Sequence, residues 1–86
     1  MYQLWAYKNN NDGFLIASSE RIILQSEDKD AILKEVLKYK NASDVYDDLT
    51  GTSSVSIVVM NMNENIDDNI VLYENTLPVQ EVISLE

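Results

Sequence analysis

Four side chains with amide or carboxylate oxygens alternate with other residues in the second half of the chain: Asn61, Asn63, Asn65 and Asp67. Oxygen ligands at alternate positions are typical of calcium-binding loops, which also need a Gly at the sixth position and a bidentate Glu at the twelfth. Counting from Asn61, these two positions hold Ile66 and Leu72, and no helices are expected on either side. The segment therefore predicts an Asx-rich hairpin turn and no metal site.

Catalytic chemistry has little support in the composition. The chain contains no His and no Cys, so the commonest general base and the thiolate nucleophile are both missing. Serine pairs stand at 18–19 and 53–54 without a base to activate them, and two glycines are too few for a phosphate-binding loop. Paired carboxylates need a pocket that shifts their pKa values, whereas most acids here fall in expected turns. We predict a protein that is not an enzyme and has no cofactor.

The charge of the chain is strongly asymmetric. Its net charge is −9, from 15 acidic and 6 basic residues. Residues 1–40 contain as many acids as cations, whereas residues 41–86 contain no Lys or Arg. Nucleic acids and anionic membranes attract cations, so direct binding to either is disfavoured. A basic surface on a larger partner protein is the expected counterpart.

The acids of the second half supply the candidate site for such a partner. They form two clusters and one further position: Asp44, Asp47 and Asp48; Glu64, Asp67 and Asp68; and Glu74. Carboxylates spaced along a rigid scaffold can replace a row of phosphates and occupy a nucleic-acid groove. The leading hypothesis is therefore an inhibitor that blocks the nucleic-acid-binding surface of a larger protein. The alternative is that both acidic clusters are ordinary solvent-exposed surface without a binding role.

No residue motif matches a known family, and the likeness that exists is one of charge and size alone. In both respects the chain is similar to small phage-encoded inhibitors that mimic DNA, including some anti-CRISPR proteins. The acids are expected to act by charge complementarity and fast association, without chemistry.

The aromatic residues near the N-terminus offer a different site. Trp5 and Tyr7 alternate along an expected strand and either pack in the core or face outward. If they face outward, they are good anchors for a partner or for a homodimer. The alternative function is then an antitoxin-like or immunity-like subunit, or an oligomeric structural subunit, that binds through the aromatic hairpin or an open sheet edge.

The first half of the chain predicts a β-hairpin followed by a helix. Residues 2–7 and 14–19 are the expected strands, joined by the turn sequence that ends in Asp12-Gly13, and 21–26 either extends the second strand or forms a third. Residues 26–40 predict an amphipathic helix capped by Ser26, with acids in its first turn and lysines near its end.

The second half predicts mainly strands. Residues 41–51 suit a short helical turn, with Ser43 as its cap, Val45 and Leu49 facing inward and Gly51 at its end. Residues 52–62 are apolar on both faces, which is typical of a central strand, and 69–74 follow as another strand. The tail fits either a helix begun by Pro78 or an edge strand begun by it.

These elements predict an α+β fold in a single domain that spans residues 1–86. We expect a mostly antiparallel sheet of four or five strands, with one main helix on one face, in the order β-β-(β)-α-β-β-(β). The N-terminal segment lacks the order of a signal peptide, and no apolar run is long enough to cross a membrane. A cytoplasmic protein without membrane contact is the expectation.

Overall fold

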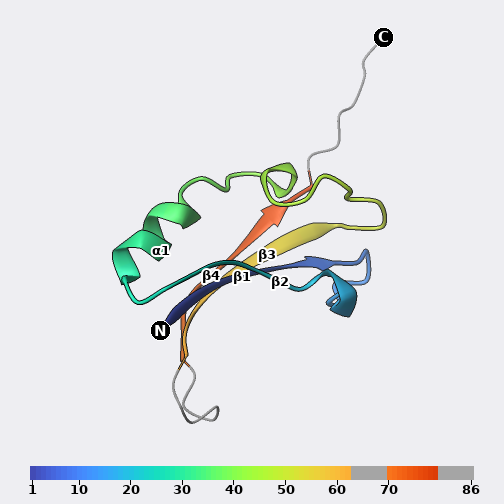
Figure 1. The fold of residues 1–86 in the computed structure, drawn as a ribbon. Helices are drawn as coiled ribbons and strands as arrows, with labels where there is room; N and C mark the ends of the chain where they lie inside the picture. Colours follow the sequence, from blue (N-terminus) through green and yellow to red (C-terminus); the bar gives the residue numbers. More distant parts are fainter. Residues whose placement is uncertain (63–69, 80–86) are drawn as a thin grey trace.

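A four-stranded antiparallel sheet with one α-helix on one face makes up the fold (Figure 1). The computed structural model describes residues 1–62 and 70–79. The elements are β1 (Tyr2–Asn9), η1 (Ala17–Ser19), β2 (Arg21–Ser26), α1 (Lys29–Val36), η2 (Ala42–Asp44), β3 (Ser54–Asn61) and β4 (Ile70–Pro78), where η marks a 3₁₀ helix. The predicted α+β class, with one α-helix on a mostly antiparallel sheet, is confirmed.

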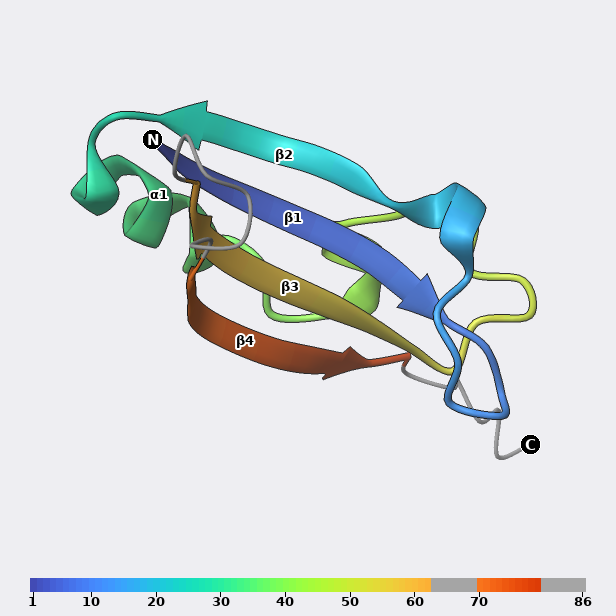
Figure 2. The ribbon, with the colours of Figure 1, turned by 90° about the horizontal axis from the view of Figure 1, so that it is seen from below.

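The strand order across the sheet is β2-β1-β3-β4, so β1 and β3 form the central pair. Because β1 is antiparallel to both β2 and β3, these two run in the same direction on either side of it. Strands that run in the same direction need a crossover connection, and residues 27–53, which include α1 and η2, make it. Figure 2 views the sheet from the side that does not carry α1. We call this side the open face.

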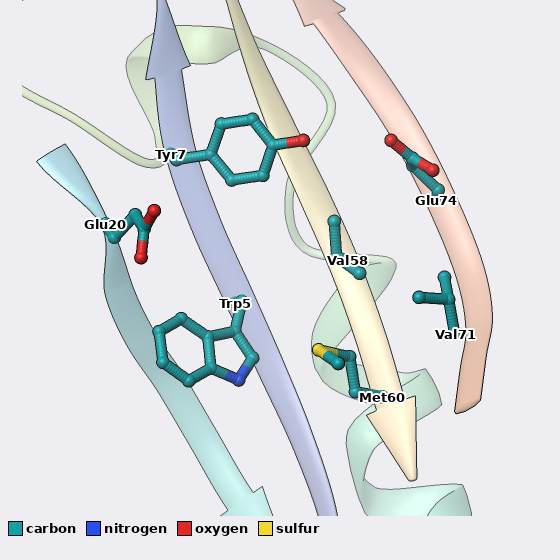
Figure 3. A pocket seen from close by; sticks show the side chains of 7 residues that line it. All are labelled: Trp5, Tyr7, Glu20, Val58, Met60, Val71 and Glu74. Atoms are coloured by element: carbon teal, nitrogen blue, oxygen red, sulfur yellow. The ribbon is translucent and has the colours of Figure 1, made fainter. Parts of the chain in front are cut away.

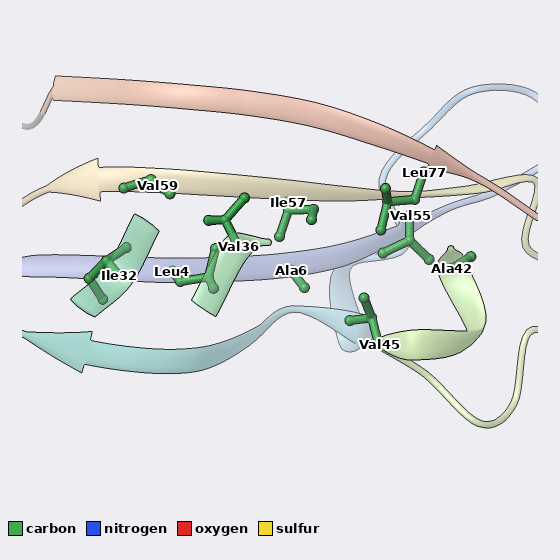
Figure 4. Packing of buried hydrophobic residues seen from close by; sticks show 10 residues of the cluster. All are labelled: Leu4, Ala6, Ile32, Val36, Ala42, Val45, Val55, Ile57, Val59 and Leu77. Atoms are coloured by element: carbon green, nitrogen blue, oxygen red, sulfur yellow. The ribbon is translucent and has the colours of Figure 1, made fainter. Parts of the chain in front are cut away.

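The core lies between the sheet and the crossover. Successive side chains of a strand point to opposite faces, so β1 turns Leu4 and Ala6 inward, and β3 does the same with Val55, Ile57 and Val59. The other buried members of this cluster are Ile32, Val36, Ala42, Val45 and Leu77 (Figure 4). β3 also buries Val58 on the open face, which confirms the prediction of a two-sided central strand.

The N-terminal hairpin differs from the prediction. The next strand along the chain that pairs with β1 is β2, and residues 14–19 do not form the expected strand: Leu15 makes a single bridge to Asn9, and η1 follows. The turn between β1 and this segment is well defined. The Asn10 side-chain oxygen accepts hydrogen bonds from the backbone N–H groups of Asp12 and Phe14, and Gly13 has a φ of 84°. After the turn the chain stays beside β1 as far as Ile16, whose N–H bonds to the carbonyl of Lys8, and η1 then takes it out of the ladder.

The helix is shorter than predicted and begins later. α1 starts after Asp28, whose carboxylate accepts a hydrogen bond from the backbone N–H of Asp30 at 2.9 Å. The predicted cap was wrong because Ser26 is the last residue of β2; its hydroxyl instead accepts a hydrogen bond from the N–H of Asp28. Beyond Leu37 the chain continues in tighter turns, with the N–H of Tyr39 bonded to the carbonyl of Val36.

The second helical turn forms, with a different cap. Asn41 caps η2, and the Asp44 carboxylate bonds back to the N–H of Asn41, so Ser43 is not the cap. Val45 is buried and Leu49 packs against the core, as predicted. Tyr46 attaches this loop to the sheet, because the cationic groups of Lys8 and Arg21 lie over its ring at 5.0 and 4.7 Å from the centroid.

The last described strand extends further than predicted. β4 continues to Pro78, which ends the strand rather than beginning one, because proline has no N–H to donate to a ladder. The rest of the expected tail, residues 80–86, lies outside the described residues, as does the Asx-rich turn at 63–69. No helix in the described part of the chain is long and apolar enough to cross a membrane.

Candidate functional site

The open face of the sheet carries a shallow pocket of about 370 Å³ (Figure 3). We call it the open-face pocket. Its lining comes from all parts of the sheet's width: Trp5, Tyr7, Glu20, Val58, Met60, Val71 and Glu74. No described helix covers this part of the sheet, so the pocket is open to a ligand or a partner.

Strand register explains why these residues meet. Trp5 of β1 is paired with Val58 of β3, which in turn is paired with Glu74 of β4. Met60 is paired with Val71 on the same face, after a bulge in β4. The five side chains therefore share one face because each lies opposite its neighbour on the next strand.

The Trp5 ring is held in place by a short relay of side chains. Its indole Nε1–H donates a hydrogen bond to the side-chain oxygen of Gln3 at 2.8 Å. The Gln3 amide nitrogen donates in turn to the side-chain oxygen of Gln25 on β2, at 2.7 Å. A ring fixed before binding loses less conformational entropy when a partner contacts it.

Two carboxylates border the pocket on opposite sides. Glu20 precedes β2 and Glu74 lies on β4, so across the sheet their backbones are separated by three strand spacings, or about 14 Å. Figure 3 shows both carboxylates flanking the aromatic rings and the apolar floor of Val58 and Met60. One cation cannot contact both acids, but it can contact either one while it lies over an aromatic ring. Such a surface suits Lys or Arg side chains, whose stems are apolar and whose heads are cationic.

The predicted acidic cluster at 44–48 lies on the other side of the sheet. η2 and the loop after it belong to the crossover, which covers the face opposite the open-face pocket. The structure therefore does not bring Asp44, Asp47 and Asp48 together with Glu74. Glu64, Asp67 and Asp68 lie outside the described residues.

Two acids of that cluster already bind the protein's own backbone. The Asp44 carboxylate accepts hydrogen bonds from the N–H groups of Lys40 and Asn41, both at 2.9 Å, and these bonds lower its pKa. The Asp48 carboxylate accepts one from the N–H of Thr50 at 3.0 Å, which lowers its pKa as well. Asp47 is exposed. Asp44 and Asp48 therefore have structural roles that the sequence reading had not assigned to them.

The alternative site at the N-terminal aromatic residues coincides with the open-face pocket. Trp5 and Tyr7 lie outside the core cluster and face the open side of the sheet, which is the outward one of the two orientations that the sequence left open. Glu74 lines the same pocket. Sequence reasoning missed Glu20 and the apolar floor of the pocket. The available signal was the alternation of Leu4 and Ala6 with the two aromatic residues, which already assigned the aromatics to the opposite face.

Metal chemistry gains no support within residues 1–62 and 70–79. No group of three or more His, Cys, Asp or Glu in this part of the chain is arranged to hold a metal ion.

Comparisons of the chain with protein-family models, curated proteins and solved structures found no match.

Proposed function

We propose that this protein is a non-enzymatic binding protein that docks a basic surface of a larger protein on the open face of its sheet. The observation that carries the proposal is the composition of the open-face pocket. Its charged lining residues are both carboxylates, Glu20 and Glu74, and they stand beside Trp5 and Tyr7. A Lys or Arg side chain of the partner fills the pocket, with its stem on the apolar floor.

Each contact in the pocket is expected to add only a modest amount to the free energy of binding. A cation over an aromatic ring contributes about 0.5–2 kcal/mol, depending on how far it is desolvated. An exposed ion pair adds about 0–1 kcal/mol. Tight binding therefore requires several contacts across the face, and the net charge of −9 accelerates the encounter with a basic partner.

The biological effect that we propose is inhibition. Surfaces rich in Lys and Arg are typical of nucleic-acid-binding proteins, because they neutralise phosphates. A protein that occupies such a surface excludes the nucleic acid, as an anti-defence inhibitor from a phage would. In this form the proposal needs no row of phosphate-like acids, because two carboxylates and two aromatic rings suffice to anchor the partner.

A second candidate is a subunit that assembles through apolar contacts, as an antitoxin-like, immunity-like or oligomeric structural protein would. The observation that favours it is the exposure of Ile22 and Val71, 45% and 52%, on two strands of the same sheet. Such an interface resists salt, whereas one that depends on Glu20 and Glu74 weakens as salt screens the charges.

The experiment is a capture from a nuclease-treated bacterial lysate with four forms of the full chain: the natural one and three variants. The first variant combines Glu20→Gln and Glu74→Gln. The second combines Asp12→Asn and Asp47→Asn, which changes the net charge equally but lies away from the pocket. The third is Trp5→Phe, which keeps an aromatic ring but removes the indole N–H.

The proposal expects a nucleic-acid-binding partner that is retained by the natural chain and the Asp12/Asp47 variant and lost by the Glu20/Glu74 variant. It expects the Trp5→Phe variant to retain part of the binding, because a phenyl ring is a weaker cation acceptor. Equal loss in both charge variants means that net charge alone drives binding. A partner that survives high salt and both charge variants supports the second candidate.

A further inference from the structure

β4 exposes a run of large apolar side chains along the edge of the sheet. Ile70, Val71, Leu72 and Tyr73 are 54%, 52%, 41% and 38% exposed. Among the described residues, β4 pairs with β3 on one side and with no strand on the other. Proteins usually protect such edges with charges, prolines or short strands, because an unpaired apolar edge recruits other strands. In β4 the proline stands at the very end of the strand.

This edge lies between two pockets, one on each face of the sheet. On the open face, Val71 and Glu74 line the pocket already described. On the other face, Tyr73 borders a pocket of about 410 Å³ beside α1, which we call the helix-side pocket. The remaining lining comes from the helix and its end: Asp30, Leu33, Lys34, Val36 and Leu37.

The helix-side pocket exists because α1 does not extend across the whole sheet. α1 packs against β1 and β2, so the face of β4 next to it is left open. Leu37 is 74% exposed there, and Leu33 is 37% exposed. Isolated exposed leucines are ordinary, but here they face Tyr73 across a pocket that the edge strand borders.

The other edge of the sheet is less suited to pairing. β2 has 6 residues where β4 has 9, and a bulge interrupts its register with β1 between Leu4 and Trp5. β4 contains a bulge of the same kind, at Leu72, so the two edges differ in length and in the pockets beside them rather than in regularity. The longer edge, with a pocket on either face, is the better docking strand.

We propose that the free edge of β4 is a strand-addition site that takes an extended segment of the basic partner, with basic side chains on one face and apolar side chains on the other. The inference rests on the proposed function in taking the partner to be basic. An added strand lies about 4.8 Å beyond β4, so its side chains on the open face reach Glu74 and Val71. Side chains on its opposite face enter the helix-side pocket.

Charge complementarity selects the segment. Glu74 is the charged residue of β4, and residues 41–86 contain no Lys or Arg to repel a basic side chain. In the helix-side pocket, Asp30 and Lys34 offset each other, and the remaining lining is apolar or aromatic. A segment that alternates Arg with Val therefore fits both faces. A second copy of β4 fits less well, because it brings another Glu74 and a second chain of net charge −9.

The test uses the full chain, labelled with ¹⁵N, and a short peptide in which Val and Arg alternate. A control peptide replaces two central valines with proline, which keeps the charge but removes two N–H donors and cannot continue a ladder. Amide shifts and hydrogen exchange at residues 70–79 report on the edge. The Trp5 indole signal reports on the open-face pocket.

The proposal expects the alternating peptide to shift the β4 amides and slow their exchange. It expects the control peptide to bind about tenfold more weakly, or worse, because strand hydrogen bonds are lost. If both peptides bind equally and shift only the Trp5 signal, the edge proposal is overturned and the proposed function stands. If the peptides leave β4 unchanged and Trp5 unshifted, both fail. If the protein without peptide sediments as a dimer and its β4 amide protons already exchange slowly, the edge is occupied by a second copy and the proposal is overturned.

Discussion

The indole nitrogen of Trp5 donates a hydrogen bond to the side chain of Gln3, two residues earlier on the same face of β1, at a distance of 2.8 Å. Gln3 passes the contact on to Gln25 of β2. This relay fixes the largest side chain of the open face against its own sheet. Trp5 is also the one tryptophan of the chain, so its fluorescence reports on the open-face pocket without other contributions.

Replacing Gln3 by Met should loosen the Trp5 ring. Met has a similar length but no oxygen to accept the indole N–H, and one such hydrogen bond contributes about 0.5–1.5 kcal/mol to stability. We expect faster exchange of the indole proton and lower fluorescence anisotropy. Gln25→Met is the control, because it removes the outer partner and leaves the bond to Trp5. Unchanged indole exchange in the Gln3 variant would show that packing alone holds the ring.

The carboxylates beside Trp5 should make its fluorescence sensitive to the charge of a quencher. Caesium ions should quench it more effectively than iodide, because Glu20 and Glu74 concentrate cations near the ring. The Glu20→Gln, Glu74→Gln double variant should reduce this preference, and added neutral salt should do the same.

The Asp12→Asn, Asp47→Asn double variant again separates local from net charge. It alters the total charge by the same amount and should leave most of the preference for caesium intact. An equal reduction in both variants would mean that the field at Trp5 comes from the whole protein and not from the pocket.

Two leucines should respond very differently to the same substitution. Leu4→Ala should cost about 2–5 kcal/mol, because the side chain is fully buried in the core and its removal leaves a cavity. Leu37→Ala should change stability by no more than about 0.5 kcal/mol, because that side chain is 74% exposed. Urea denaturation of both variants checks this, and a large loss for Leu37→Ala would show that the side chain packs on the chain itself.

The alternation along β1 shows how far the sequence alone could go. The alternation of small or aliphatic residues (Leu4, Ala6) with aromatic ones (Trp5, Tyr7) is enough to assign the two faces of this strand. The apolar pattern on both faces of β3 correctly predicted a central strand. Which acids stand beside the aromatics depends on strand order. Glu74 lines the same pocket as Trp5 because β3 pairs with both β1 and β4, and that strand order is non-local.

The errors at the termini of elements have local causes. An apolar run after a Gly-containing turn predicted a return strand at 14–19. The run makes one bridge to β1, at Leu15, and then turns into η1, where the Ser19 hydroxyl accepts the N–H of Lys8 in place of a strand carbonyl. The carboxylates of Asp44 and Asp48 were taken for binding groups, because a sequence does not show that nearby backbone N–H groups already use them.

Thr52 offers a site for stabilisation. Its side-chain oxygen is buried and has no hydrogen-bond partner among the described residues. A buried polar group without a partner costs about 1–3 kcal/mol, and valine has nearly the same shape without that cost. Thr52→Val should therefore raise the urea midpoint by an amount that corresponds to about 1 kcal/mol. Thr52→Ser is the control, since it keeps the hydroxyl and loses the methyl group; a Thr52→Val variant that is less stable would reveal a partner for the oxygen.

Asp44 should make the fold sensitive to acid. Hydrogen bonds from the N–H groups of Lys40 and Asn41 lower its pKa in the folded protein below the value of about 3.9 in the unfolded chain. Its contribution to stability is therefore present above the unfolded pKa and is lost as the pH falls through the folded one. Asp44→Asn should be less stable than the natural chain near neutral pH, and the difference should shrink below about pH 4. Urea midpoints measured across this range check the prediction.

The Asp44 variant should keep part of the acid sensitivity, because Asp48 and Glu35 also have lowered pKa values. A difference that stays constant with pH would mean that Asp44 stabilises η2 through geometry and not through its charge.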